Sequence, residues 1–158
     1  MLASSNGSSR MACLTGDLMQ IVSNILVAVV ALMHIFFLVL EMFLWTKPYG
    51  LKTFGNTPER AETTKVLAAN QGLYNGFLAA GLVWSLMVWS PLFAFDIKMF
   101  FLGCVIVAAL YGGYSVSRRI LMVQGLPALV ALVVTIALAN PYLEVTDCCK
   151  PDNISTGF

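Results

Sequence analysis

The chain has 158 residues, of which 59% are hydrophobic and only 11% are charged, with a formal net charge of +1. Soluble domains carry about 25% charged residues, so this composition excludes an ordinary soluble protein and indicates a single membrane domain. The near-neutral charge gives no reason to expect nucleic acid as a partner. The partner that the composition predicts is the lipid bilayer.

Residues 1–19 are rich in serine and glycine and lack the continuous apolar core of a cleavable signal peptide. We therefore expect a polar N-terminal tail over 1–19, a membrane domain over 20–142 and a polar C-terminal tail over 143–158. A membrane-spanning helix needs about 20 apolar residues. Four segments qualify, at about 20–45, 66–90, 98–117 and 120–140. They predict an all-α, polytopic membrane protein with four transmembrane helices in an antiparallel bundle.

The connections between these spans have recognisable signals. Lys47 to Gly50 is expected to form a turn after the first span, and a short connection through Asp96 should lead to the third. Thr57-Pro58-Glu59 predicts a helix start ahead of membrane entry, because a threonine cap, a proline and an early acid favour a helix N-terminus. A turn is expected at Arg118-Arg119, because one helix over 98–140 would be about 60 Å long, twice the hydrocarbon thickness.

Lysine and arginine concentrate in the cytoplasmic connections of membrane proteins. The connections 46–65 and 117–119 hold six of these residues, whereas the tails and the 91–98 connection hold three: Arg10, Lys98 and Lys150. We therefore expect a multi-pass protein with both termini extracytoplasmic. The glycosylation sequons at Asn6 and Asn153 would then lie outside, and their use stays open.

Polar side chains fall at similar depths in the cytoplasmic half of these spans or near their middle. They are the candidate pocket residues His34, Glu41, Asn70, Gln71, Tyr74, Asn75, Tyr111, Tyr114 and Gln124. Polar groups in hydrocarbon are costly unless they face one another or water, so we expect all of them to turn inward around a pocket open to the cytoplasm. His34 and Asn75 should lie deepest.

Two further patterns concern helix packing. Ala68, Gly72, Gly76 and Ala80 form a ridge of small residues at four-residue spacing, which lets helices approach closely in lipid. In the last span, Pro127 cannot donate a backbone hydrogen bond, so the helix should be locally disturbed near Gln124. Such disturbed backbone is tolerated where it is buried in protein or lines a cavity.

Three segments resemble a known family: His34 to Trp45, Lys65 to Gly81 and Tyr111 to Leu129. The block Ala-Asn-Gln-Gly-Leu-Tyr-Asn at 69–75 is the most specific part. The family is the domain of unknown function 1304, small integral membrane proteins of bacteria and fungi. The resemblance covers about residues 20–140 and implies a short four-helix membrane protein.

Glu41 and His34 each allow two interpretations. Glu41 could be an acid–base, proton-coupling or cation-binding group, or a structural carboxylate paired with Lys65 or held by Asn70 and Gln71. His34 could act in function or simply pack through hydrogen bonds. The two lie on one helix face, about 10 Å apart along the axis, so a direct pair would need a bridging ligand or water. The sequence predicts no metal site and no cofactor, because further ligands at depth and nucleotide-binding motifs are missing.

These observations predict an integral membrane protein of the uncharacterised family that binds or transports a small molecule or ion through the pocket. Transport by so small a chain would require a homodimer. One alternative is a membrane enzyme that uses Glu41 and His34 as an acid–base pair on a lipid-like substrate. Another is a structural or accessory membrane subunit. Ligand, membrane and enzymatic activity stay open.

Overall fold

The computed structural model describes residues 5–142, with side chains from residue 15 onward, and this part contains helices and no strands. The all-α prediction is therefore confirmed. The elements are α1 (Ser5–Met42), α2 (Pro48–Phe54), α3 (Pro58–Met87), α4 (Pro91–Ser115), α5 (Arg118–Ile120), the π-helical segment η1 (Leu121–Gly125) and α6 (Leu126–Leu138).

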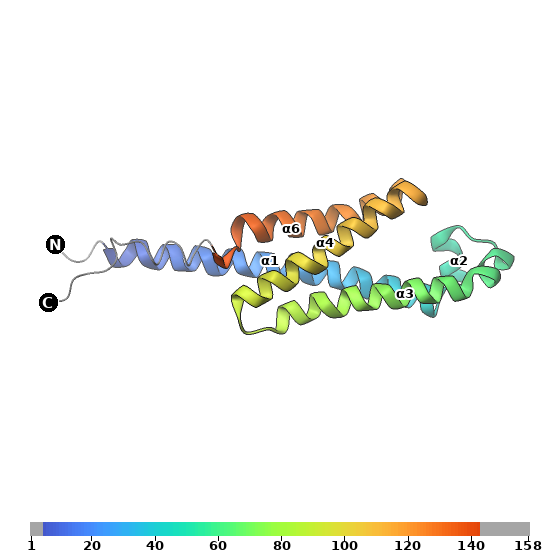
Figure 1. Ribbon diagram of the computed structural model, residues 1–158, viewed down its shortest axis with the longest axis horizontal. Helices are drawn as coiled ribbons and strands as arrows, with labels where there is room; N and C mark the ends of the chain where they lie inside the picture. Colours follow the sequence, from blue (N-terminus) through green and yellow to red (C-terminus); the bar gives the residue numbers. More distant parts are fainter. Residues whose placement is uncertain (1–4, 143–158) are drawn as a thin grey trace.

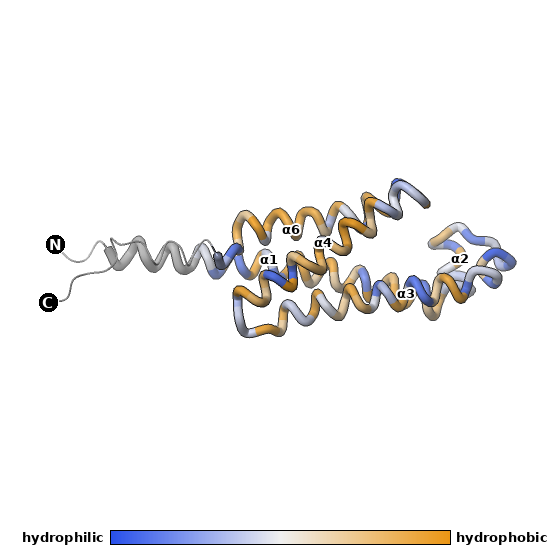
Figure 2. Tube along the Cα trace, in the orientation of Figure 1, coloured by the Kyte–Doolittle hydropathy of each residue, from blue (hydrophilic) through white to orange (hydrophobic). Residues whose placement is uncertain are grey.

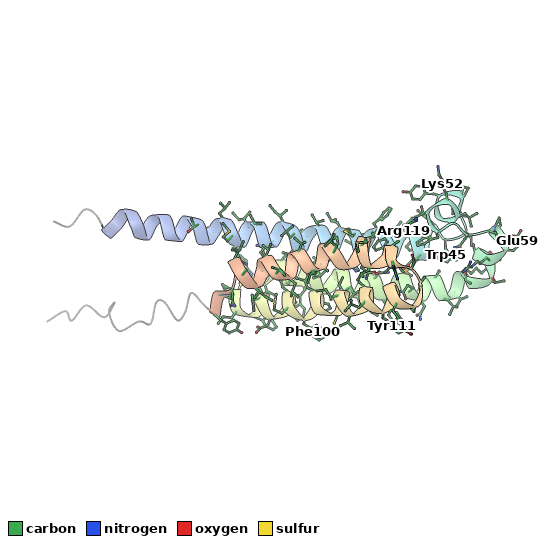
Figure 3. The ribbon with its side chains drawn as sticks, turned by 90° about the horizontal axis from the view of Figure 1, so that it is seen from above. Trp45, Lys52, Glu59, Phe100, Tyr111 and Arg119 are labelled. Carbon is green, nitrogen blue, oxygen red and sulfur yellow. The ribbon has the colours of Figure 1, made fainter. Side chains whose placement is uncertain are left out.

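The long helices form an antiparallel bundle (Figure 1). Helices α1 and α3 run side by side, and α4 crosses the bundle from α3 toward α6, which packs on α1. Figure 3 places Lys52 and Glu59 at the same end of the bundle as Arg119. The two basic connections therefore lie together, and the described chain begins and ends at the opposite end.

Three stretches are long and apolar enough to cross a membrane: Thr15–Met42 with 28 residues, Pro91–Ser115 with 25 and Arg118–Leu138 with 21. Helix α3, with 30 residues, has the required length but a more polar composition. The structure thus supports a multi-pass helical membrane protein, and the crossing by α3 stays a prediction. Figure 2 shows the apolar helices in orange and the more polar α2 end in blue.

Several boundaries differ from those predicted. Helix α1 begins at Ser5 and not near residue 20, because the sequence has no proline before Pro48 to stop the helix from propagating. The expected turn at Lys47 to Gly50 is instead the start of the short helix α2, with Pro48 in its first turn. The expected connection through Asp96 is helical, because α4 already begins at Pro91.

Helix starts follow the cap-and-proline pattern. Thr57 accepts a hydrogen bond from the Arg60 amide at 3.3 Å, as predicted for the start of α3. Ser90 accepts from the Phe93 amide at 3.4 Å and starts α4 in the same way. A break between α4 and the last span is present, but it lies at residues 116–117, and the predicted turn residues Arg118 and Arg119 instead begin the short helix α5.

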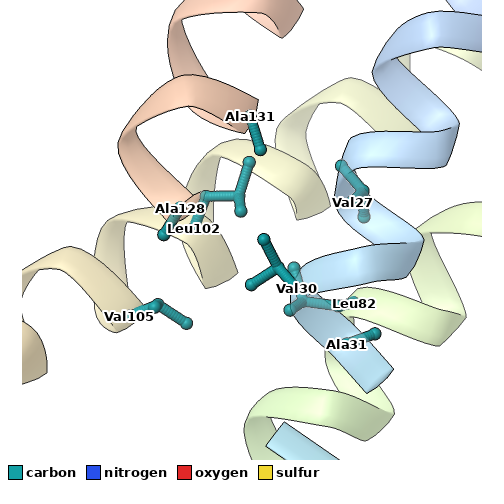
Figure 4. Packing of buried hydrophobic residues seen from close by; sticks show 8 residues of the cluster. All are labelled: Val27, Val30, Ala31, Leu82, Leu102, Val105, Ala128 and Ala131. Carbon is teal, nitrogen blue, oxygen red and sulfur yellow. The ribbon is translucent and has the colours of Figure 1, made fainter. Parts of the chain in front are cut away.

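The core is a cluster of small and medium apolar side chains from all four long helices (Figure 4): Val27, Val30, Ala31, Leu82, Leu102, Val105, Ala128 and Ala131. Large apolar side chains lie outside instead, and Leu32 and Phe100 are about two-thirds exposed, at 64% and 65%. A bundle with a small-residue core and a large apolar exterior is typical of helices that pack against one another in lipid.

Helices α1 and α3 approach most closely along two glycines of α3. A Cβ atom on Gly72 would lie 2.7 Å from the Met42 Cγ and 3.2 Å from the Leu38 carbonyl oxygen. A Cβ on Gly76 would lie 2.6 Å from the Leu38 Cδ1. The predicted small-residue ridge therefore forms this contact at its two glycines, whereas Ala80 is exposed and Ala79 takes the buried position.

Candidate functional site

Glu41 lies one residue before the end of α1, where α3 runs close beside it. Its carboxylate Oε2 accepts a hydrogen bond of 2.8 Å from the side-chain amide of Asn75, which is 5% exposed. The same amide nitrogen also donates to the Gln71 carbonyl at 3.3 Å, which fixes its orientation. The glycine contact between α1 and α3 thus brings an intramembrane acid against a buried amide.

The residues expected to hold Glu41 in a purely structural role do not contact its carboxylate. Lys65 forms an ion pair with Glu62, one turn away on the exposed face of α3. Among the described side chains this is the single ion pair, so no described cation neutralises Glu41. Asn70 hydrogen-bonds to the Tyr74 hydroxyl at 3.4 Å, also on the outside. Within residues 15–142, the side chain that holds the carboxylate is Asn75.

His34 is fully buried where α1 meets the last span. Its Nδ1 lies 2.8 Å from the Val30 carbonyl oxygen, and a carbonyl can only accept, so Nδ1 carries the hydrogen. Its Nε2 lies 3.2 Å from the Nε2 of Gln124. The Gln124 amide therefore donates to the unprotonated ring nitrogen, and the contacts define a neutral imidazole in a single tautomer.

Gln124 reaches His34 from the π-helical segment η1. The predicted disturbance of the last span is therefore confirmed, and it takes the form of a wider turn in which the Leu126 amide donates to the Leu121 carbonyl. Pro127, at the start of α6, leaves the carbonyl four residues earlier without its usual donor. Single π-helical turns inside α-helices occur frequently at functional sites.

The structure divides the predicted pocket residues into two hydrogen-bonded pairs and a set on the outside. Glu41 pairs with Asn75 across the α1–α3 contact, and His34 pairs with Gln124 across the contact with the last span. The sequence predicts that His34 and Asn75 lie at the same depth in the membrane. The Asn75 side chain instead contacts Glu41, nearer the end of α1. The other five candidates are exposed: Asn70, Gln71, Tyr74, Tyr111 and Tyr114.

The two tyrosines of α4 face outward for a packing reason. A Cβ atom on Gly112 or Gly113 would lie 3.0 Å from side chains of Ile120 and Leu121 respectively, so this glycine face is turned toward the last span. Tyr111 and Tyr114 flank that face and are 71% and 91% exposed. Within one copy of the chain, these tyrosines lie on the surface of the bundle.

No group of three or more histidine, cysteine, aspartate or glutamate side chains comes together within the described part of the chain. Cys104 is a free, half-buried cysteine of α4. Cys148 and Cys149 lie outside the described residues, as does the sequon at Asn153. The described site therefore presents one carboxylate, one imidazole and amides as its polar groups.

The profile described as protein of unknown function (DUF1304) matches residues 28–136, which contain His34, Glu41, Asn75 and Gln124. The chain belongs to the DUF1304 family. The uncharacterized protein YpaA of Lactococcus lactis subsp. lactis (strain IL1403) is 32% identical to this chain over 117 residues, which are 73% of this chain and 97% of YpaA. No solved structure matches this DUF1304 chain.

Sequence reasoning missed a second polar cluster, in the other half of the bundle. The sequence predicts that Lys98 lies in an outer connection, but it lies two turns inside α4 and is 1% exposed. Its Nζ donates to the Asn24 side-chain oxygen at 2.6 Å. The sequence does contain a signal for this position. Ser90-Pro91 has the same cap-and-proline pattern as Thr57-Pro58, which indicates that the helix begins before Lys98.

Proposed function

We propose that this DUF1304 protein binds a small molecule or ion at Glu41 and transfers it, or a proton, through the cytoplasmic half of the membrane. The observation that supports this proposal is a carboxylate within an apolar span that is held by one amide and has no cation beside it among the described side chains. Ionisable residues inside membranes are rare and mark ion or substrate pathways. A buried carboxylate without a cation is costly to the fold, so packing alone gives no reason to keep it there.

The chemistry of the pair fits reversible binding. A carboxylate has two oxygens that can accept hydrogen bonds, and the described contacts use Oε2. Oε1 is left for a proton, a cation or the donor group of a ligand. Asn75 would hold the carboxylate in place during this exchange, because its own orientation is fixed by the Gln71 carbonyl.

The side of the membrane that Glu41 faces follows from the distribution of lysine and arginine. Glu41 lies near the end of α1 that leads into α2, and the basic connections gather at this end. With the positive-inside rule, this end faces the cytoplasm and both termini lie outside. Exposed polar side chains on α3 and α4, such as Tyr74 and Tyr111, would then be covered in a homodimer, which remains part of the proposal.

Proton flux in proteoliposomes tests the proposal. The wild type is reconstituted with a pH-sensitive dye inside, a pH gradient is imposed, and the same measurement is made on Glu41→Gln. Glu59→Gln is the matched control, because Glu59 is an exposed acid in the first turn of α3. We expect flux in the wild type and the control and none in Glu41→Gln.

Stability separates a functional from a structural carboxylate. Glutamine has nearly the shape of glutamate and avoids burying a charge, so Glu41→Gln should unfold at the same temperature as the wild type or a higher one. Mass spectrometry of both purified proteins would show whether a co-purifying small molecule disappears with the carboxylate. Unchanged flux and unchanged bound molecules in a stable Glu41→Gln would contradict the proposal and favour an accessory subunit.

A membrane enzyme is the second candidate, and the geometry of His34 favours it. The ring is held in one tautomer, so its Nε2 is an oriented proton acceptor that a substrate could reach by displacing Gln124. Glu41 would supply the second proton-transfer group on the same face of α1. Lipid profiles of membranes expressing wild type or His34→Gln test this: a lipid species that differs between them supports the enzyme, and identical profiles oppose it.

A further inference from the structure

The largest fully buried side chain of the described bundle is that of Lys98. An ammonium group has three N–H donors, and in the described structure its hydrogen-bond partner is the Asn24 oxygen. No carboxylate neutralises it, since the ion pair of the described chain is Lys65 with Glu62. The acid two residues earlier, Asp96, accepts instead from the Tyr142 hydroxyl at 3.0 Å.

An unneutralised ammonium in hydrocarbon is costly, and a fixed amide compensates only part of that cost. An anion beside it would supply the missing charge. The site therefore resembles one half of an ion pair whose second half is not provided by the described chain.

A hollow in the surface of the bundle reaches Asn24 from outside, while Lys98 does not line it and lies buried behind Asn24. Its volume is about 350 Å³, and it is lined by Asn24 together with Ile21, Ile25 and Ala28 of α1 and Leu86 of α3. Asn24 is half-buried and takes part in both features. Its oxygen accepts from Lys98, so its amide N–H groups can donate to a group in the hollow. The rest of the lining is apolar.

The depth of the site suits a lipid head group. Lys98 lies seven residues after Pro91, which is about 10 Å along the helix. Helix α4 has 25 residues and is therefore about 37 Å long, somewhat more than the hydrocarbon thickness of about 30 Å. Lys98 consequently lies only several ångströms below the boundary between head groups and hydrocarbon, within reach of a lipid that tilts inward.

We propose that the hollow between α1 and α3 binds an anionic lipid of the surrounding bilayer at the Asn24–Lys98 pair. The acidic head group receives hydrogen bonds from Asn24 and is neutralised by Lys98 behind it. One acyl chain lies along the apolar side chains of Ile21, Ile25 and Leu86. This site is in the opposite half of the bundle from Glu41 and does not depend on the function proposed there.

Native mass spectrometry of the purified chain in mild detergent tests the site. The probes are palmitoyl-oleoyl phosphatidic acid, the phosphatidylcholine with the same chains, and inorganic phosphate. We expect phosphatidic acid to bind at least tenfold more tightly than phosphatidylcholine. Equal binding of both lipids would overturn the charge argument, and phosphate binding as tight as that of phosphatidic acid would overturn the role of the acyl chain.

Two variants assign the binding to this pair. Lys98→Met removes the charge behind Asn24 at nearly constant volume and should weaken phosphatidic acid binding about tenfold or more, because each tenfold in affinity corresponds to about 1.4 kcal/mol of lost attraction. Lys52→Gln, at an exposed lysine of α2, is the control and should bind as the wild type does.

Asn24→Asp keeps the test decisive if Lys98→Met fails to fold. It places a carboxylate at the same distance from Lys98, so the chain neutralises its own lysine, and the unfolding temperature should rise while lipid binding falls. Undiminished binding of phosphatidic acid to a folded Asn24→Asp would overturn the proposal.

Discussion

The close contact between α1 and α3 can be tested with one methyl group. In Gly72→Ala the new Cβ would lie 2.7 Å from the Met42 Cγ, 3.1 Å from the Glu41 Cβ and 3.2 Å from the Leu38 oxygen. The methionine end can move, but the Leu38 oxygen belongs to the helix backbone and can move only with α1. Glu41 would be displaced from Asn75 at the same time.

Two opposing effects set the size of the change. Replacing a helical glycine by alanine favours the helix by about 1 kcal/mol. Overpacking a tight contact costs about 1–3 kcal/mol. Gly103→Ala separates the two, because a Cβ at Gly103 of α4 would have no atom within 4 Å. We therefore expect Gly103→Ala to be neutral or stabilising and Gly72→Ala to be less stable than it by about 1–3 kcal/mol.

The assay is the free energy of unfolding measured by detergent titration in mixed micelles. Proton flux measured on the same samples should fall in Gly72→Ala and stay unchanged in Gly103→Ala. If both variants have the same stability, the α1–α3 contact is not as close as described, and the positioning of Glu41 by Asn75 loses its basis.

The remaining predictions concern two polar contacts at the end of the bundle opposite α2. Thr135 donates to the Ala131 carbonyl at 2.7 Å, so in its 2.7 Å contact with Ser23 the serine is the donor. Thr135→Val should therefore lower the free energy of unfolding by about 0.6–1.7 kcal/mol, and Ser23→Ala should cost less, in the same detergent titration. The reverse order would contradict this assignment of donor and acceptor. The Asp96 carboxylate accepts from the Tyr142 hydroxyl and raises the pKa of that phenol above its ordinary value of 10.0, because the contact favours the protonated form. This contribution to stability is present below pH 10.0 and is lost as pH rises through the raised pKa. In an NMR titration Tyr142 should ionise at higher pH in the wild type than in Asp96→Asn; equal midpoints would rule out the contact.

The local features of the fold were predictable because they depend on neighbouring residues. Long apolar runs identified helices of membrane length, and a cap followed by proline marked the start of α3. The lost backbone donor of Pro127 predicted a disturbed last span, and η1 is that disturbance. In each case the physical cause lies within about four residues of its effect.

The sequence by itself determined that polar groups exist inside the bundle, and only the tertiary structure decided which of them meet. Glu41 pairs with Asn75 because Gly72 and Gly76 set the register and separation of two helices whose paired residues are 34 positions apart. Gln71 and Tyr74 lie on α3 with Asn75, yet their side chains are exposed. Lys98 became a buried cation because of where α4 starts and what packs on it. Helical periodicity assigns a residue to a face, but the rotation and register of two packed helices depend on steric fit along their whole contact, which no short stretch of sequence contains.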